Sequence, residues 1–271
     1  MSKKEGYKEF LSRLLDEFLK TSNDEKIREY LTSNSSLPGP RGNLELAFAF
    51  AEVAADFSEK DSGKMWELAS RLIGVSAGEA PVNDPKEILS FCGAVAIGAI
   101  ASARGEFFPK AFHLLRRLAE DSRWRTREGV AMGLQRLIAG RGQSALEELD
   151  GWVEKNEWLV MRAVAAGVAE PALLRDKQIA KGALGLHEKI FSHIFVAEYR
   201  KTDEFKTLRQ ALGYSLSVVI CAIPKEGFEY LRRLAGSRDP DVLWVLRENL
   251  KKNRLAKNFP AEVVASRKLL P

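Results

Sequence analysis

The chain has few of the residues and segments that mark secreted or membrane-spanning proteins. It contains two cysteines, Cys92 and Cys221, which lie far apart inside apolar runs. We therefore expect buried thiols in a reducing compartment and no disulfide framework. No run reaches the roughly 18 apolar residues that span a bilayer, and the charged, amphipathic start lacks the apolar core of a secretory signal. These absences predict a cytoplasmic protein that does not enter a membrane.

The spacings that mark common catalytic and metal sites are also missing. The three histidines, His113, His187 and His193, share no ligand spacing with one another, and the cysteines form no pair. There is no G-x-S-x-G motif. The glycine-rich stretch at 140–144 has neither the lysine nor the spacing of a phosphate-binding loop, so it predicts an interhelical turn. We expect no catalytic residue, cofactor or metal, and an interpretation without enzymatic activity is favoured.

Charge is unevenly distributed along the chain. Residues 1–105 hold 13 Lys+Arg and 16 Asp+Glu, a net charge of −3, whereas residues 106–271 hold 29 and 21, a net charge of +8. A basic half of this kind is compatible with an anionic partner such as nucleic acid. It is equally compatible with charges spread over solvated helix faces.

Helical periodicity runs through most of the sequence, and the alternation expected of strands is nearly absent. Apolar residues between Tyr7 and Phe18 recur every three or four positions, which predicts one amphipathic helix. Residues 33–43 and 76–85 are rich in Ser, Pro and Gly and predict loops. The segment 88–102 is apolar on all sides and rich in small residues, so we expect a helix sandwiched between close neighbours.

Four segments repeat one pattern, an acidic or amide residue followed six positions later by arginine and then by a helix rich in small apolar residues. Successive arginines are 35, 47 and 38 residues apart, within or near the period of helical solenoid repeats. The four pairs are Asp121 and Arg127, Asn156 and Arg162, Asp203 and Arg209, and Asp241 and Arg247.

This pattern resembles the HEAT repeat, in which Asp stands in the turn between two antiparallel helices and Arg or Lys follows six residues later. The string WRTREGVAMGLQRL is also similar to a bacterial and archaeal group of HEAT-repeat proteins without an assigned activity. The resemblance implies an all-α fold, an α-α superhelix of about six or seven antiparallel helix pairs. It divides the chain into an N-terminal hairpin (1–35), degenerate repeats (41–105), HEAT-like repeats (106–256) and a C-terminal tail (257–271), expected to form one continuous solenoid.

The spacing has a physical reason. Aspartate in the turn can accept hydrogen bonds from the first amides of the second helix. Arginine six residues later can reach the aspartate of a neighbouring repeat, which would give a ladder of ion pairs. We therefore interpret this set as structural, and its members are Asp121, Arg127, Arg162, Asp203, Arg209, Asp241 and Arg247.

A basic and aromatic cluster is the best candidate for a binding site. Arg123, Trp124 and Arg125 open one second helix, and Trp158 opens the next. The second helices of HEAT repeats line the concave surface, so these side chains are expected along one groove. Arginine beside tryptophan suits a phosphate backbone or exposed bases. The alternative is that each tryptophan packs between repeats.

The chain also resembles, more distantly, the HEAT-like glycosylases of DNA alkylation repair. Those enzymes hold an Asp with tryptophans in the groove, and the positions available here are Asp150 beside Trp152 and Asp241 near Trp244. Neither pair reproduces a catalytic motif. The favoured hypothesis is a non-enzymatic scaffold that binds a protein partner along the concave face. The alternative is a nucleic-acid-binding protein with base-excision activity.

Overall fold

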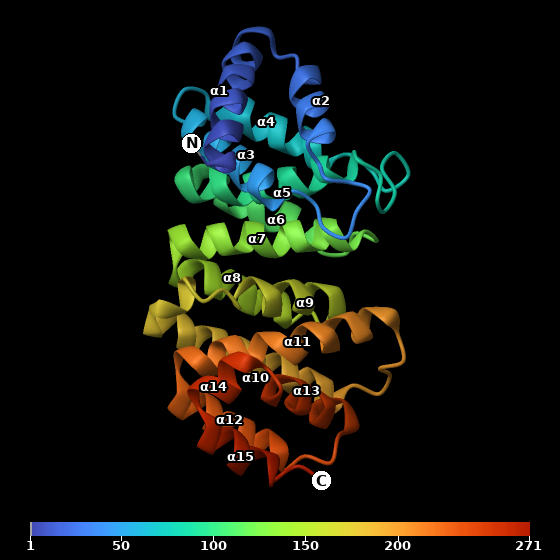
Figure 1. The fold of residues 1–271 in the computed structure, drawn as a ribbon, viewed down its shortest axis with the longest axis vertical. Coiled ribbons are helices and arrows are strands. Elements are labelled where there is room, and N and C mark those ends of the chain that lie inside the picture. Colours follow the sequence, from blue (N-terminus) through green and yellow to red (C-terminus); the bar gives the residue numbers. More distant parts are fainter. Residues whose placement is uncertain (1) are drawn as a thin grey trace. The chain divides into compact units, whose positions relative to one another are not determined.

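The computed structural model describes residues 2–271, and Figure 1 shows that this part of the chain is built from helices. Fifteen α-helices and two short 3-10 helices make up its regular structure, and no strand occurs between residues 2 and 271. The predicted all-α fold class is confirmed. The chain divides into two compact units, the first ending at Arg141 and the second beginning at Gly142.

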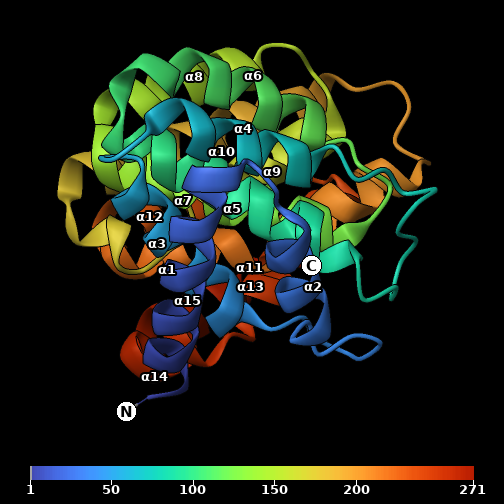
Figure 2. The ribbon, with the colours of Figure 1, turned by 90° about the horizontal axis from the view of Figure 1, so that it is seen from above.

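The first unit contains seven α-helices arranged in two layers. Figure 2 shows α4 and α6 on one side of this unit and α1, α3 and α5 on the other. The helices are α1 (Lys3–Thr21), α2 (Glu25–Ser33), α3 (Leu44–Phe57), α4 (Ser62–Ile73), α5 (Glu87–Ala103), α6 (Phe108–Leu118) and α7 (Trp124–Arg141).

Helix α5 is the centre of the first unit. It packs against α3 and α7 within its own layer and against α4 from the other layer. Every residue from Glu87 to Ala101 is buried, which a helix can achieve only when neighbours cover all its sides. The prediction of a sandwiched helix over residues 88–102 is confirmed.

Small residues bring α5 and α7 unusually close together. A methyl group added to Gly98 would overlap the backbone of Gly133, and one added to Gly133 would lie 2.5 Å from the carbonyl oxygen of Ala94. The hydroxyls of Ser90 and Thr126 share a buried hydrogen bond of 2.7 Å across the same interface. Contacts advance along both helices in the same direction, so α5 and α7 run parallel, as equivalent helices of successive repeats do.

The second unit contains eight α-helices. They are α8 (Gln143–Val153), α9 (Trp158–Gly167), α10 (Lys177–Val196), α11 (Asp203–Ala222), α12 (Pro224–Ala235), α13 (Pro240–Leu250), α14 (Asn253–Asn258) and α15 (Pro260–Arg267). Helix α11 packs between α9 and α13, whereas α8 packs against α10. The unit is therefore also a two-layer stack of helices joined by short connections, the local arrangement of an α-α solenoid.

A buried amide joins α11 and α13. Asn249 is fully buried and donates from its side chain to the carbonyl oxygens of Leu212 and Val245, both at 2.8 Å. Its carbonyl oxygen accepts from the backbone N–H of Ser217 at 2.7 Å. Because all its polar atoms find partners, this amide can lie in an apolar interface without an unpaired group.

Helix boundaries follow local chemistry. Asp176, Thr202 and Asp239 cap α10, α11 and α13 by accepting hydrogen bonds from the first amides of each helix. Proline occupies the first position of α12, α13 and α15, where no backbone donor is needed. Residues 257–271, expected as a tail, include α15, whose Arg267 donates to the carbonyl oxygen of Leu250 at 2.9 Å.

Candidate functional site

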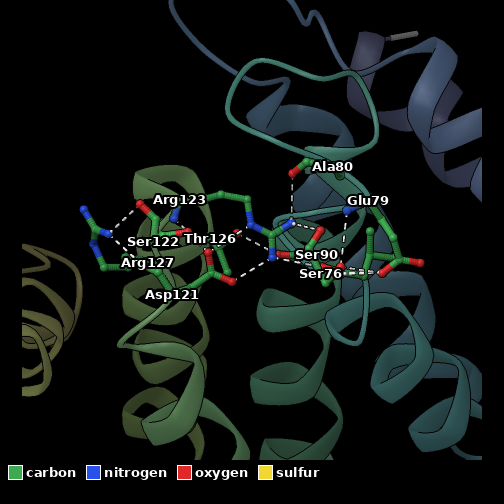
Figure 3. Close-up of polar contacts among 10 residues, drawn as sticks. Ser76, Glu79, Ala80, Ser90, Asp121, Ser122, Arg123, Thr126 and Arg127 are labelled. Carbon is green, nitrogen blue, oxygen red and sulfur yellow. Dashed lines mark hydrogen bonds and ion pairs between the residues drawn. The ribbon is translucent and has the colours of Figure 1, made fainter.

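The N-terminal end of α7 carries the cluster singled out in the sequence, and its first arginine is an interior residue. Arg123 is 1% exposed. Its guanidinium donates to the carbonyl oxygens of Val75 at 2.9 Å and of Ser76 and Ala80 at 3.3 Å, as Figure 3 shows for the last two. It also donates to both carboxylate oxygens of Asp121, at 2.9 and 2.7 Å. All five N–H donors of the group are thus used within the protein.

The partners of Arg123 shape the loop between α4 and α5. Glu79 accepts hydrogen bonds from the backbone N–H and the hydroxyl of Ser76, at 2.9 and 2.7 Å, which closes a tight turn (Figure 3). Burial alone would raise the pKa of Asp121, but the hydrogen bonds from Arg123 outweigh burial and hold that pKa below its usual value. The pair therefore stays ionised at neutral pH and fixes the loop to the start of α7.

Arg125 is the second buried cation of this end, at 4% exposure. It forms an ion pair with the fully buried Glu87 at 3.0 Å and donates to the side-chain oxygen of Asn83 at 2.8 Å and to the carbonyl oxygen of Gly39. The loops before α3 and before α5 are thereby tied to α7. Buried cations with opposite charges and carbonyls around them hold a fold together and offer little charge to a ligand.

Trp124, between these two arginines, faces outward. Its side chain is 42% exposed, and the guanidinium of Arg125 lies 4.3 Å from its ring. The cation covers one face of the indole and holds the ring in place. The result is an exposed aromatic side chain supported by a buried arginine. We call this feature the Trp124 platform and define it as Trp124 with its two chain neighbours Arg123 and Arg125.

The structure does not present the predicted cluster as a basic surface. Arg123 and Arg125 were expected to face a groove, but their guanidinium groups point inward, because turn carbonyls and the carboxylates of Asp121 and Glu87 solvate them better than an open groove could. Trp158 belongs to the second unit. It is half-buried and packs edge-to-face on Phe205, with ring centroids 5.2 Å apart.

The residues of the expected ladder have different roles in different repeats. Arg209 of α11 forms an ion pair with Asp241 of α13 at 2.5 Å, a contact between neighbouring repeats. Arg127 instead donates to the carbonyl oxygens of Asp121 and Ser122 at 2.6 and 3.1 Å (Figure 3). Arg162 is buried within α9.

Arg247 and Asp203 depart furthest from the expected geometry. Arg247 donates to the carbonyl oxygen of Pro271 at 2.7 Å, at the end of the same unit. Asp203 is not a cap: Thr202 caps α11, so Asp203 already lies in the helix and pairs with Lys206 at 2.9 Å. Asp239 likewise caps α13 and leaves the carboxylate of Asp241 for Arg209.

Both aspartates considered for base excision form ion pairs with basic side chains of the protein. Asp150 accepts from Lys189 at 2.7 Å, and Trp152 beside it is buried. Asp241 is held by Arg209 and also lies 3.5 Å from Arg200. A carboxylate in ion pairs of this kind has a structural explanation for its position.

The histidine and cysteine side chains form no ligand set. Within residues 2–271, no group of three or more His, Cys, Asp and Glu side chains is arranged to hold a metal ion. Cys92 is buried as expected, whereas Cys221 is only half-buried at the end of α11. None of the helices in that range has the length and apolar character needed to cross a bilayer.

Sequence reasoning placed Asp121 only in the ladder and missed the other groups that hold the two arginines. Glu87 and the carbonyl oxygens of residues 75, 76 and 80 lie about 40 residues before α7, and no repeat pattern connects them to it. The only available signal was a lone glutamate at the start of an otherwise apolar helix, a position that requires a buried partner.

Comparison with known proteins gives similarity to solved structures alone. No protein-family model and no curated protein matches the chain. A designed armadillo repeat protein, YIII(Dq)4CqI, is similar over 82% of this chain and 98% of its own, at 12% identity and a TM-score of 0.30. At that TM-score the likeness carries no weight beside the helix packing described above.

Proposed function

We propose that this chain is a HEAT-like binding scaffold that recognises a protein partner, with the Trp124 platform as a principal contact. Stacked helix pairs are typical of proteins that bind others along an extended surface. The observation that supports a protein ligand is the combination of an exposed indole and buried, neutralised arginines. An aromatic ring held rigid before binding loses little conformational entropy on contact, which is why Trp is enriched among residues that dominate interfaces.

The same observation disfavours nucleic acid as the ligand of this platform. Phosphate binding needs cations that can exchange their counterions for phosphate groups. The charges of Arg123 and Arg125 are already paired with Asp121 and Glu87. The basic C-terminal half leaves nucleic-acid binding elsewhere on the chain as the alternative, which the experiment below distinguishes.

The test compares two exposed aromatic residues of the first unit. Immobilised wild-type protein, Trp124→Ala and Phe10→Ala are incubated with lysate of the source cells, and retained proteins are identified by mass spectrometry. Phe10 is a matched control, since its exposure of 44% is close to the 42% of Trp124. We expect a partner retained by the wild type and by Phe10→Ala but lost with Trp124→Ala. Titration of the purified partner should show affinity lowered on the order of tenfold or more.

Two results would contradict the proposal. One is a partner that binds all three proteins equally, which would move the contact away from Trp124. The other is the absence of any protein partner together with tight binding of DNA or RNA in fluorescence polarisation. Affinity that falls steeply with salt would then assign the protein to the nucleic-acid-binding class.

A further inference from the structure

A small cavity in the second unit has apolar walls and a rim of basic side chains. Its volume is about 350 Å³, and it lies where the ends of α11 and α14 meet the start of α10. The walls are largely apolar and include Leu174, Val218 and Ala222, with the thiol of Cys221 among them. Such a volume is at the lower end of the range of about 300–1,000 Å³ typical of small-molecule sites.

The rim carries three cations and no anion. Arg175, Lys177 and Arg254 line the cavity, and no aspartate or glutamate does. Lys177 donates to the carbonyl oxygen of Ala222, which holds its ammonium group at the rim. The guanidinium groups of Arg175 and Arg254 form no hydrogen bond or ion pair with the described part of the chain.

Three arginines elsewhere in the protein are paired with carboxylates instead. Arg123, Arg125 and Arg209 each face a carboxylate, so their charges serve the fold. At the cavity three like charges lie around apolar walls that no carboxylate lines, an arrangement that repels cations and concentrates anions. A ligand that fits both the apolar walls and the basic rim needs a hydrocarbon body and a negative head group.

From this we infer that the cavity is a binding site for a small anionic amphiphile, a short hydrocarbon chain ending in a carboxylate. The chain lies against Leu174, Val218 and the Cys221 thiol, and the carboxylate is held by Arg254 and Arg175. Charge-assisted hydrogen bonds from arginine suit a carboxylate because the planar guanidinium donates two parallel bonds. This site is independent of the Trp124 platform, which belongs to the first unit.

The two cysteines supply a readout of occupancy. Cys221 lines the cavity and is half-buried, whereas Cys92 is fully buried in α5. Burial raises the pKa of Cys221, an effect partly offset by Arg254, so its labelling is best measured at mildly alkaline pH. A neutral thiol reagent such as N-ethylmaleimide should therefore label Cys221 in the folded protein, and labelling of Cys92 would report unfolding.

The experiment measures the rate of N-ethylmaleimide labelling at each cysteine by mass spectrometry while octanoate is added below its micelle-forming concentration. Octylamine has the same chain and the opposite charge, and acetate has the same head group without the chain. We expect octanoate to slow labelling of Cys221 at least fivefold at saturation, and octylamine and acetate to leave the rate within twofold. Calorimetry of octanoate with Cys221→Ser should show the same affinity, which separates binding from an effect on the thiol.

Variants of the rim test the role of charge. Arg254→Gln and Arg175→Gln should each weaken octanoate binding about threefold to tenfold, the range for charge-assisted contacts at a partly exposed rim. Arg232→Gln removes an exposed arginine of the same unit that does not line the cavity, so it should bind octanoate as the wild type does. Equal protection by octanoate and octylamine, or no protection by octanoate, would overturn the inference. So would full octanoate affinity in both rim variants.

Discussion

His187 gives the most direct test of the interior of the second unit, because its protonation is coupled to folding. The imidazole is fully buried in α10. Its Nδ1 lies 2.8 Å from the carbonyl oxygen of Ala183, and its Nε2 lies 2.8 Å from the hydroxyl of Ser215. A carbonyl oxygen only accepts, so Nδ1 carries the proton and Nε2 accepts from Ser215. These contacts satisfy both nitrogens of a neutral ring, the form that burial favours.

Burial lowers the pKa of His187 to about 4, although the hydrogen bond to Ala183 raises it slightly. In the unfolded chain the value returns to about 6.5. Between these values the unfolded state binds a proton that the folded state does not, so stability is complete above pH 6.5 and is lost as the pH falls towards 4. Integrating this difference from pH 7 to pH 5 gives a loss of about 2 kcal/mol from this one group.

The assay is urea denaturation of the wild type and His187→Gln at several pH values. Carboxylates contribute equally to both proteins, so the useful quantity is the difference between their free energies of unfolding. We expect that difference to change by about 2 kcal/mol between pH 7 and pH 5, with the wild type losing more. Histidine NMR titration of the wild type should show one ring with a pKa near 4. Parallel pH profiles, or a His187 ring that titrates near 6.5, would refute the reasoning.

Two further predictions concern the first unit and its packing. Gly98→Ala should lower the free energy of unfolding by about 2 kcal/mol or more, because the added methyl group overlaps the backbone of Gly133 on a parallel helix that cannot move alone. Gly151→Ala is the control: nothing lies within 4 Å of its added methyl group, so calorimetry should show a gain of up to about 1 kcal/mol from helix propensity. Arg123→Met should cost about 3 kcal/mol, because Asp121 loses its ion pair and the carbonyl oxygens of Val75 and Ala80 lose their side-chain donor. Hydrogen exchange of residues 75–80 should rise in that variant, and unchanged exchange would show that the loop does not depend on this arginine.

Much of the fold could be predicted because a helix produces a pattern of apolar residues within a short stretch of sequence. Apolar residues at intervals of three and four identified α1, and a segment apolar on all sides identified α5 as a central helix. Proline and glycine placed the breaks within a few residues. The caps were harder, since neighbouring Thr and Asp compete for the same role: Thr202 caps α11, and the adjacent Asp203 does not.

The candidate site could not be predicted from local sequence patterns alone. Sequence spacing brought Arg123, Trp124 and Arg125 together at one helix terminus, but consecutive residues there point in different directions. Arg123 pairs with Asp121 two residues earlier, but the carbonyl oxygens of Val75 and Ala80 and the carboxylate of Glu87 lie 38 to 48 residues earlier. No local pattern records those contacts.

Helical periodicity and the spacing of small residues were sufficient to specify an all-α chain of closely packed helix pairs, because both act through neighbours within a few residues. Only tertiary packing decided that Arg123 and Arg125 are buried and join loops to α7, and that Trp124 remains exposed. It alone placed Arg175 and Arg254 beside an apolar cavity that no carboxylate lines. The reason is that burial and pairing of charge are properties of groups brought together in space, and their free energies depend on partners far apart in the chain.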